Sequence, residues 1–80
     1  MKSKTILIAN QDDLWNRSLS TFFHGMGYKV EATKFMGEMI RRIRKGNIQV
    51  LLIDDEIEGV KACDVVPLLK NINPKIQVIV

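Results

Sequence analysis

The chain has 80 residues, with 12 Lys and Arg against 9 Asp and Glu, and a formal net charge of +3. This length allows one domain with a modest core, and so small a basic excess is not in itself a signature of nucleic-acid binding. The single cysteine excludes an internal disulfide, and no apolar run reaches the length of a signal sequence or a membrane span. We therefore expect a small soluble domain of the cytoplasm that does not bind membranes, and nucleic acid is not the partner that its composition favours.

Residues 5–9 (TILIA) form an apolar run without alternation, which is typical of a strand buried on both faces of a parallel sheet. The polar residues 10–13 (NQDD) then favour a loop and a helix N-terminus, because their side chains accept hydrogen bonds from free backbone N–H groups. A helix should follow and end at Gly25 or Gly27. Apolar residues at helical spacing predict its buried face, namely Trp15, Leu19, Phe22, Phe23 and Met26.

Residues 28–32 alternate between apolar and polar side chains, as a half-exposed edge strand does. Thr33 is the predicted N-cap of a second helix, which Gly46 ends. The basic cluster in residues 41–45 lies near the end of this helix, where the helix dipole favours cations, so a solvated face is expected there. The predicted buried stripe of the helix consists of Phe35, Met36, Met39, Ile40 and Ile43.

Residues 50–59 (VLLIDDEIEG) join a buried strand to an acidic loop. The apolar run of residues 50–53 predicts a third parallel strand, which stops at Asp54, and Gly59 is the first residue free to turn. The carboxyl edge of an open parallel sheet is where ligands bind, so Asp54 is the leading candidate for a functional side chain. We expect its neighbours Asp55, Glu56 and Glu58 to form a solvated loop.

A third helix is predicted after this loop, with Asp64 as its N-cap and Pro67 in its first turn, where a missing N–H does no harm. Residues 76–80 (IQVIV) then predict a fourth strand. The alternation of strands and helices with short loops demands right-handed crossovers and a parallel sheet. Because nothing in the sequence covers the last apolar strand, we expect a homo-oligomer that forms through this exposed edge.

Three segments, TILIANQDD, KGNIQVLLIDDEIEG and NPKIQVIV, resemble in order and spacing the receiver domains of two-component response regulators. The resemblance implies an incomplete flavodoxin-like three-layer α/β sandwich, with four parallel strands in the order 2-1-3-4 and three helices. It also implies a signalling module that is not an enzyme. The match covers the whole chain but only the first part of a receiver, so we expect residues 1–80 to be a receiver-like domain truncated after its fourth strand.

The resemblance further implies that Asp54 is the phosphoacceptor and that a histidine kinase or phosphotransfer protein is the donor. Receivers place two carboxylates after the first strand to help bind Mg²⁺, whereas this chain has Asn10 and Gln11, so we expect a weakened Mg²⁺ site. Asp12 would replace a missing carboxylate if the loop shifted. Alternatively, Asp12 and Asp13 are first-turn residues that the helix dipole favours. The candidate metal ligands are Asp54, Asp12, Asn10, Gln11 and Glu56.

Three functional hypotheses remain open at this stage. The first is a receiver module that takes a phosphoryl group on Asp54. The second is a degenerate or truncated pseudo-receiver that acts by protein–protein binding or self-association without phosphorylation. The third is a small basic binding module that uses residues 41–45. The hydroxyl residue and the lysine that complete a receiver site would both lie beyond Val80.

Overall fold

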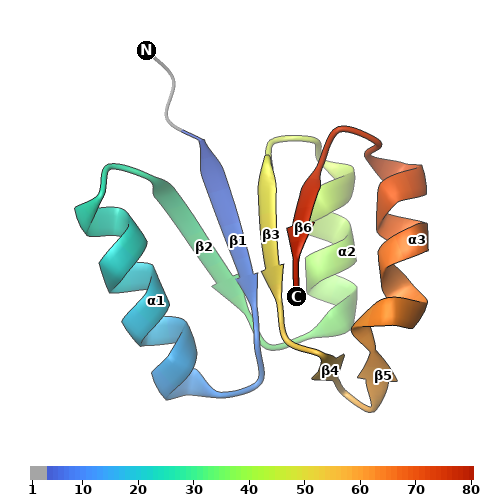
Figure 1. Ribbon diagram of the computed structural model, residues 1–80, viewed down its shortest axis with the longest axis horizontal. Coiled ribbons are helices and arrows are strands. Elements are labelled where there is room, and N and C mark those ends of the chain that lie inside the picture. Colours follow the sequence, from blue (N-terminus) through green and yellow to red (C-terminus); the bar gives the residue numbers. More distant parts are fainter. Residues whose placement is uncertain (1–3) are drawn as a thin grey trace.

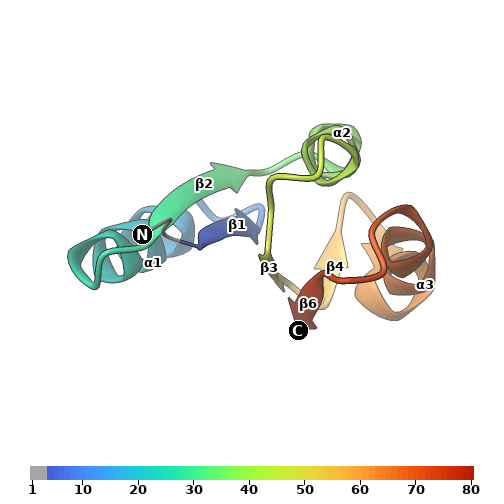
Figure 2. The same ribbon diagram turned by 90° about the horizontal axis from the view of Figure 1, so that it is seen from above.

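The computed structural model describes residues 4–80, and a four-stranded parallel sheet lies at its centre (Figure 1). Figure 2 shows the first helix of the chain on one face of the sheet and the second and third on the other. This arrangement confirms the predicted three-layer α/β fold and the predicted strand order 2-1-3-4. In spatial order the strands are β2 (Lys29–Thr33), β1 (Thr5–Ala9), β3 (Val50–Ile53) and β6 (Gln77–Ile79), and the helices are α1 (Asp13–Gly25), α2 (Met36–Arg44) and α3 (Ala62–Ile72).

The main core lies between the sheet and the pair of helices α2 and α3. Strand β1 is buried along its whole length, as its unbroken apolar run predicted. Alternate residues of the strands point to opposite faces, so one set of strand side chains faces the two helices. The cluster that they form contains Leu7, Ala9, Met39, Ile43, Leu51, Ile53, Val65 and Leu69.

Helix α1 presents a different face to the sheet from the one predicted. Trp15, Phe22 and Met26 are 55%, 59% and 59% exposed, so the prediction that they are buried is wrong. Helix α1 is the only helix on its side of the sheet in the part of the chain that the structure describes (Figure 2), and its flank towards β3 and β6 has no helix to pack against. The less exposed stripe of α1 consists of Asn16, Leu19, Ser20 and Phe23.

Helix α2 begins at Met36, two residues later than the predicted N-cap Thr33 implies. Thr33 is the last residue of β2, and its Oγ1 accepts a hydrogen bond from the backbone N–H of Phe35 at 3.2 Å. Phe35 therefore takes the N-cap position and is 56% exposed, so its predicted place in the buried stripe is wrong. Met39 and Ile43 are buried as predicted, and Gly46 has the positive φ expected after a helix C-terminus.

Helix α3 begins earlier than predicted, and the reason lies in the segment before it. The backbone N–H of Ala62 donates to the carbonyl of Asp55 at 2.8 Å, which fixes the first residue of the helix. Asp64 therefore lies within the first turn instead of at the N-cap, and Pro67 lies inside the helix instead of in its first turn. A proline at this position cannot donate to the carbonyl of Cys63, four residues earlier.

A short hairpin between β3 and α3 was not predicted. Its strands are β4 (Glu56–Ile57) and β5 (Val60–Lys61), which pair antiparallel. Glu58 and Gly59 form the turn with φ of 52° and 79°, and two positive φ values are what a tight type I′ turn requires. Ile57 is 1% exposed and anchors the hairpin in the core, so this segment is an ordered unit and not merely the solvated loop expected.

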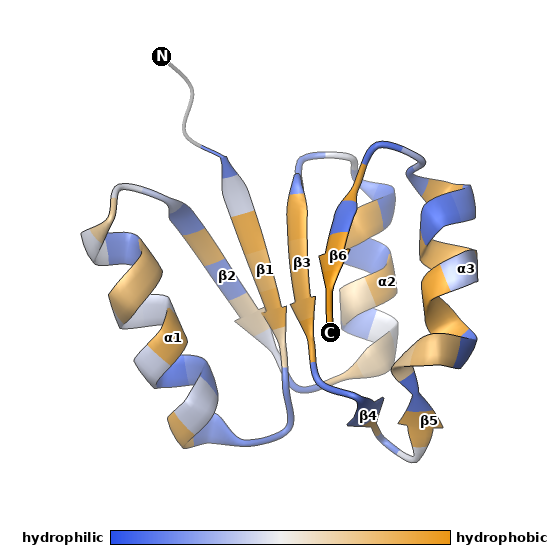
Figure 3. Ribbon diagram, in the orientation of Figure 1, coloured by the Kyte–Doolittle hydropathy of each residue, from blue (hydrophilic) through white to orange (hydrophobic). Residues whose placement is uncertain are grey.

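Strand β6 lies at one edge of the sheet and is shorter than the strand predicted at residues 76–80. Its register pairs it with β3, and its other edge pairs with no strand within residues 4–80. Ile79 and Val80 are 55% and 70% exposed, and Figure 3 shows the apolar end of this strand uncovered. The expectation of an uncovered apolar edge is therefore confirmed for the described residues.

Arg42, in the predicted basic cluster, lies in an internal cluster of ion pairs between β2 and α2. It pairs with Glu31 of β2 and with Glu38 of α2. A hydrogen bond from the Thr33 hydroxyl is the largest cause that holds the pKa of Glu38 below its ordinary value. The positive charges of Arg42 and Arg41 lower this pKa further. Arg42 is thus engaged within the domain.

Within residues 4–80, no helix combines the length and the apolar character needed to cross a membrane.

Candidate functional site

Asp54 and Asn10 meet at the carboxyl edge of the sheet, where the neighbouring strands β1 and β3 end. The backbone N–H of Asp54 donates to the carbonyl of Ala9 at 3.0 Å, so the parallel pairing continues into the loop. Asp54 is exposed, and its Oδ1 accepts a hydrogen bond from the backbone N–H of Asp55 at 2.9 Å. These residues line a pocket of about 470 Å³, with Trp15 and Val80 among the apolar residues of its wall.

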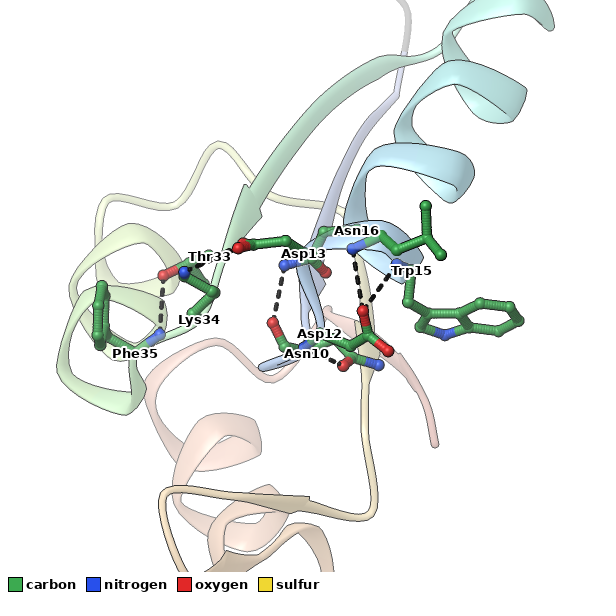
Figure 4. A network of polar contacts seen from close by, with 9 residues as sticks. Asn10, Asp12, Asp13, Trp15, Asn16, Thr33, Lys34 and Phe35 are labelled. Atoms are coloured by element: carbon green, nitrogen blue, oxygen red, sulfur yellow. Dashed lines mark hydrogen bonds and ion pairs between the residues drawn. The ribbon is translucent and has the colours of Figure 1, made fainter.

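The loop after β1 is held by hydrogen bonds centred on Asn10 (Figure 4). The backbone N–H of Asn10 donates to the carbonyl of Thr33 at 3.1 Å, and its Oδ1 accepts from the N–H of Asp12 at 2.9 Å. The Nδ2 of Asn16 donates to the Asn10 carbonyl at 2.7 Å. Asn10 thus supports the loop through its main chain and its side-chain oxygen.

Asn16 has a positioning role that the sequence reasoning missed. It is 7% exposed, and its Nδ2 ties helix α1 to the end of β1. Its Oδ1 has no hydrogen-bond partner within the described part of the chain. An amide on the sheet-facing stripe of an amphipathic helix is the signal that could have identified it, because a buried polar group requires a partner.

Asp12 and Asp13 serve the start of helix α1. The carboxylate of Asp12 accepts hydrogen bonds from the N–H groups of Leu14 and Trp15 at 2.9 and 3.4 Å, which makes it the N-cap. Asp13 lies in the first turn and pairs with Lys34 at 3.1 Å (Figure 4). Asp12 does not line the Asp54 pocket, so the geometry matches the helix-terminus interpretation of this pair.

Gln11 takes part in a chain of two hydrogen bonds that joins three segments at this edge of the sheet. Its Oε1 accepts a hydrogen bond from the N–H of Glu58 at 3.1 Å. The carboxylate of Glu58 in turn accepts from the N–H of Met36 at 2.6 Å, at the start of helix α2. Gln11 and Glu58 therefore connect the loop after β1, the turn of the hairpin and the N-terminus of α2.

Replacing Glu58 with alanine should destabilise the domain by about 0.5–2 kcal/mol, because the Met36 N–H loses its acceptor at the helix N-terminus. Urea unfolding followed by circular dichroism measures this change. Glu58→Gln is the matched control, since it keeps an oxygen acceptor and the same left-handed backbone requirement. Equal losses of stability in the two variants would show that the hydrogen bond to Met36 contributes nothing.

Glu56 lies apart from the other candidate ligands. It lines a separate hollow of about 350 Å³ with Asp55, Lys61 and Cys63, among others. Within residues 4–80, no three His, Cys, Asp or Glu side chains are grouped closely enough to hold a metal ion. The structure therefore brings Asn10 and Asp54 to one pocket, and it leaves Gln11, Asp12 and Glu56 outside that pocket's lining.

The donor set around Asp54 suits at most a weakly held Mg²⁺ ion. Mg²⁺ in proteins keeps several waters and binds through one or two carboxylates together with substrate phosphate oxygens. Asp54 and Asp55 supply carboxylates at this pocket, whereas the amide oxygens of Asn10 and Gln11 already accept hydrogen bonds from backbone N–H groups. Neutral amides also lack the charge that would offset the cost of partly dehydrating the ion.

Comparison of the sequence with protein-family models finds no matching family, and a search of curated proteins finds no match. Comparison of the fold with solved structures finds close similarity. The beryllofluoride-activated NtrC4 receiver domain dimer matches with a TM-score of 0.87 and 20% identity over 94% of this chain. A response regulator receiver domain protein from Clostridium thermocellum matches with a TM-score of 0.86 and 18% identity over 94% of this chain.

A third similar structure is a response regulator protein from Burkholderia pseudomallei with a phosphorylated aspartic acid, a calcium ion and citrate. It has a TM-score of 0.85 and 13% identity over 95% of this chain. The chain spans 62%, 61% and 45% of the lengths of these three structures. The fold is therefore a partial receiver fold of the flavodoxin-like type, as the resemblance in the sequence implied.

Proposed function

We propose that this chain is a receiver-like module of two-component signal transduction in which Asp54 accepts a phosphoryl group. The observation that carries the proposal is an exposed carboxylate at the end of the central strand β3, in a pocket at the carboxyl edge of a receiver-type sheet. Ligands bind at that edge in open α/β folds. The phosphoryl donor is a histidine kinase or a phosphotransfer protein, and the setting is the cytoplasm.

In the proposed reaction, a carboxylate oxygen of Asp54 forms a bond to the phosphorus of a phosphohistidine. The P–N bond breaks, and its electron pair remains on the histidine nitrogen of the donor. The hydrogen bond from the Asp55 N–H to Oδ1 limits the rotation of the Asp54 carboxylate and so orients it. A Mg²⁺ ion, when bound through Asp54, would neutralise charge on the phosphoryl oxygens.

A second candidate function is binding without phosphorylation, as a pseudo-receiver. Asn10 and Gln11 favour it, because their amides hold the loops together and supply no negative charge for a metal ion. The unpaired edge of β6 and the exposed Ile79 favour self-association as the binding event. In either case we propose that residues 1–80 form the N-terminal part of a receiver domain, consistent with a chain that spans 62% of the NtrC4 receiver structure.

Intact-mass spectrometry after incubation with acetyl phosphate distinguishes the two functions. We expect a phosphoryl adduct that depends on Mg²⁺ and is absent from Asp54→Asn, because that amide keeps the size of the side chain but loses the nucleophilic oxygen. Asp64→Asn is the matched control and should retain the adduct, because Asp64 is exposed and lies outside the lining of this pocket. No adduct on folded wild-type protein would overturn the phosphorylation proposal and leave the pseudo-receiver function.

A further inference from the structure

The charged residues of this domain are divided between the two ends of the sheet. In a parallel α/β fold every strand-to-helix loop lies at one end and every helix-to-strand loop at the other, as Figure 1 shows. We call the end where the strands begin the amino pole and the end where they finish the carboxyl pole. The amino pole carries six cations and no carboxylate in the described chain: Lys4, Lys29, Arg44, Lys45, Lys70 and Lys75.

The carboxyl pole has the opposite charge. It carries two lysines, Lys34 and Lys61, against seven carboxylates. These carboxylates are Asp12, Asp13, Asp54, Asp55, Glu56, Glu58 and Asp64. Charges of one sign at each end of a molecule this small create a field that orients charged partners over a Debye length of about 10 Å at 0.1 M salt.

Ion pairs within the domain do not neutralise either pole. The described residues contain ion pairs of Asp13 with Lys34, of Glu31 and Glu38 with Arg42, and of Glu38 with Arg41. None of the six cations of the amino pole takes part in them, and Asp13 is the one carboxylate of the carboxyl pole that does. Lys70 donates a hydrogen bond to the Ile76 carbonyl, and Asp12 and Glu58 accept hydrogen bonds from backbone N–H groups. These contacts are with neutral groups, so they leave the net charge of each pole in place.

Helix dipoles explain only part of this distribution. Three helices end at the amino pole, and cations near helix C-termini are favourable, which accounts for Arg44, Lys45 and Lys70. Lys4, Lys29 and Lys75 instead precede or begin strands. A helix terminus gives them no stabilisation through their own element, so the amino pole is more basic than its helix ends require.

The two poles also differ in shape. The amino pole contains a hollow of about 1070 Å³, lined by Lys4, Lys29 and His24 together with polar residues such as Asn47 and Gln49. At the carboxyl pole, the β4–β5 hairpin projects beyond the end of the sheet (Figure 1). The hairpin carries exposed Glu56, Glu58 and Lys61, and the exposed Asp54 and Asp55 directly precede it. A projection with a net negative charge and a basic hollow therefore lie at opposite ends of the same molecule.

We propose that the amino pole of one copy of this chain binds the carboxyl pole of a second copy, with the acidic β4–β5 hairpin directed at the basic hollow. Such a contact is heterologous, since it joins two different surfaces, and it extends head to tail unless the rotation closes a ring. It differs from the pairing of two β6 edges, in which both copies contribute the same surface. The proposal does not depend on whether Asp54 accepts a phosphoryl group.

Two charge-reversal variants test the contact by sedimentation velocity. The first replaces Lys4, Lys29, Lys45 and Lys75 with glutamate, which leaves two cations against four carboxylates and makes the amino pole acidic. The second replaces Asp55, Glu56 and Asp64 with lysine, which leaves five cations against four carboxylates and makes the carboxyl pole basic. All seven side chains are exposed and lie outside the core. We expect each variant alone to sediment as a monomer at low salt, whereas the wild type self-associates and an equal mixture of the two variants associates as well.

Recovery of association in the mixture is specific to a contact between opposite poles, because only the mixture pairs an acidic pole with a basic one. Raising NaCl to about 0.5 M should dissociate both the wild type and the mixture, since the Debye length falls to roughly 4 Å. Association of the wild type that persists at high salt and in both variants would overturn the proposal and indicate pairing through β6 edges.

Binding of a nucleic acid by the amino pole is the other outcome that would contradict the proposal. The probe is a fluorescently labelled single-stranded DNA oligonucleotide, titrated with the wild type and with the variant whose amino pole is acidic. Salt-sensitive binding by the wild type alone, with no self-association at low salt, would assign the basic surface to a polyanion and not to a second copy. Monomeric wild type without DNA binding would also overturn the proposal.

Discussion

Replacing Asn10 with aspartate and Gln11 with glutamate is expected to raise the affinity for Mg²⁺ at least about tenfold, which equals about 1.4 kcal/mol. Both substitutions exchange an amide for a carboxylate of the same size, so the acceptors for Asp12 N–H and Glu58 N–H remain. The charge added at residue 10 lies in the lining of the Asp54 pocket, where a charge about 4 Å from an ion contributes several kcal/mol even at an effective dielectric constant of about 20. The charge added at residue 11 acts from outside that lining and contributes less. Isothermal titration calorimetry with MgCl₂ measures the change.

The control for this experiment lies at the other end of β3. Gln49 precedes that strand, and its Oε1 accepts a hydrogen bond from the N–H of Thr5 at 2.7 Å. Gln49→Glu therefore makes the same chemical change in a similar hydrogen bond, but away from Asp54. We expect it to leave Mg²⁺ affinity unchanged. A similar gain in both proteins would mean that net charge, and not a site at Asp54, attracts the ion.

Replacing Leu51 with alanine is expected to lower the free energy of unfolding by about 2–5 kcal/mol, a large share of the stability of a small domain. Leu51 is fully buried in β3 and belongs to the core cluster beneath α2 and α3. Its removal leaves a cavity that the surrounding side chains fill only in part. Equilibrium unfolding in urea, followed by circular dichroism, gives the difference between the variant and the wild type.

The adjacent residue provides a matched comparison. Leu52 points to the opposite face of the sheet, is only partly buried and lines the pocket beside Asp54. Leu52→Ala should cost clearly less than Leu51→Ala, because its side chain gives up fewer contacts and opens no closed cavity. If the two substitutions cost the same, the face of the sheet beside α1 must be covered in solution, for example by a second copy.

The position of Asp54 follows from the sequence pattern. The unbroken apolar runs of Thr5–Ala9 and Val50–Ile53 predicted central strands, and the structure places β1 and β3 between β2 and β6. The full order 2-1-3-4 was implied by the resemblance to receiver domains, because the apolar residues 76–80 by themselves predict an interior strand and not an edge strand. Asp54 ends one of the apolar runs, so its place at the carboxyl edge of the sheet is a consequence of where that run stops.

The sequence could not predict which apolar residues of helix α1 are buried. Periodicity places Trp15, Leu19 and Phe22 along one side of α1, but it does not say what lies opposite that side. The structure shows that Trp15 and Phe22 are largely exposed, and within residues 4–80 no other helix lies on the α1 side of the sheet (Figure 2). The apolar pattern of a helix shows which of its sides would pack against another element. Whether that side is buried depends on whether such an element lies there.

The sequence by itself determined the α/β alternation, the parallel sheet, the central place of β1 and β3 and the exposed carboxylate at the end of β3. These features depend on residues close together in the chain, through apolar runs and helical periods. Only the tertiary structure decided the roles of Gln11, Asn16 and Glu58, because their hydrogen bonds join loops that the fold brings together. Glu58 reaches Gln11 across 47 positions and Met36 across 22, and no local pattern specifies a partner at such distances.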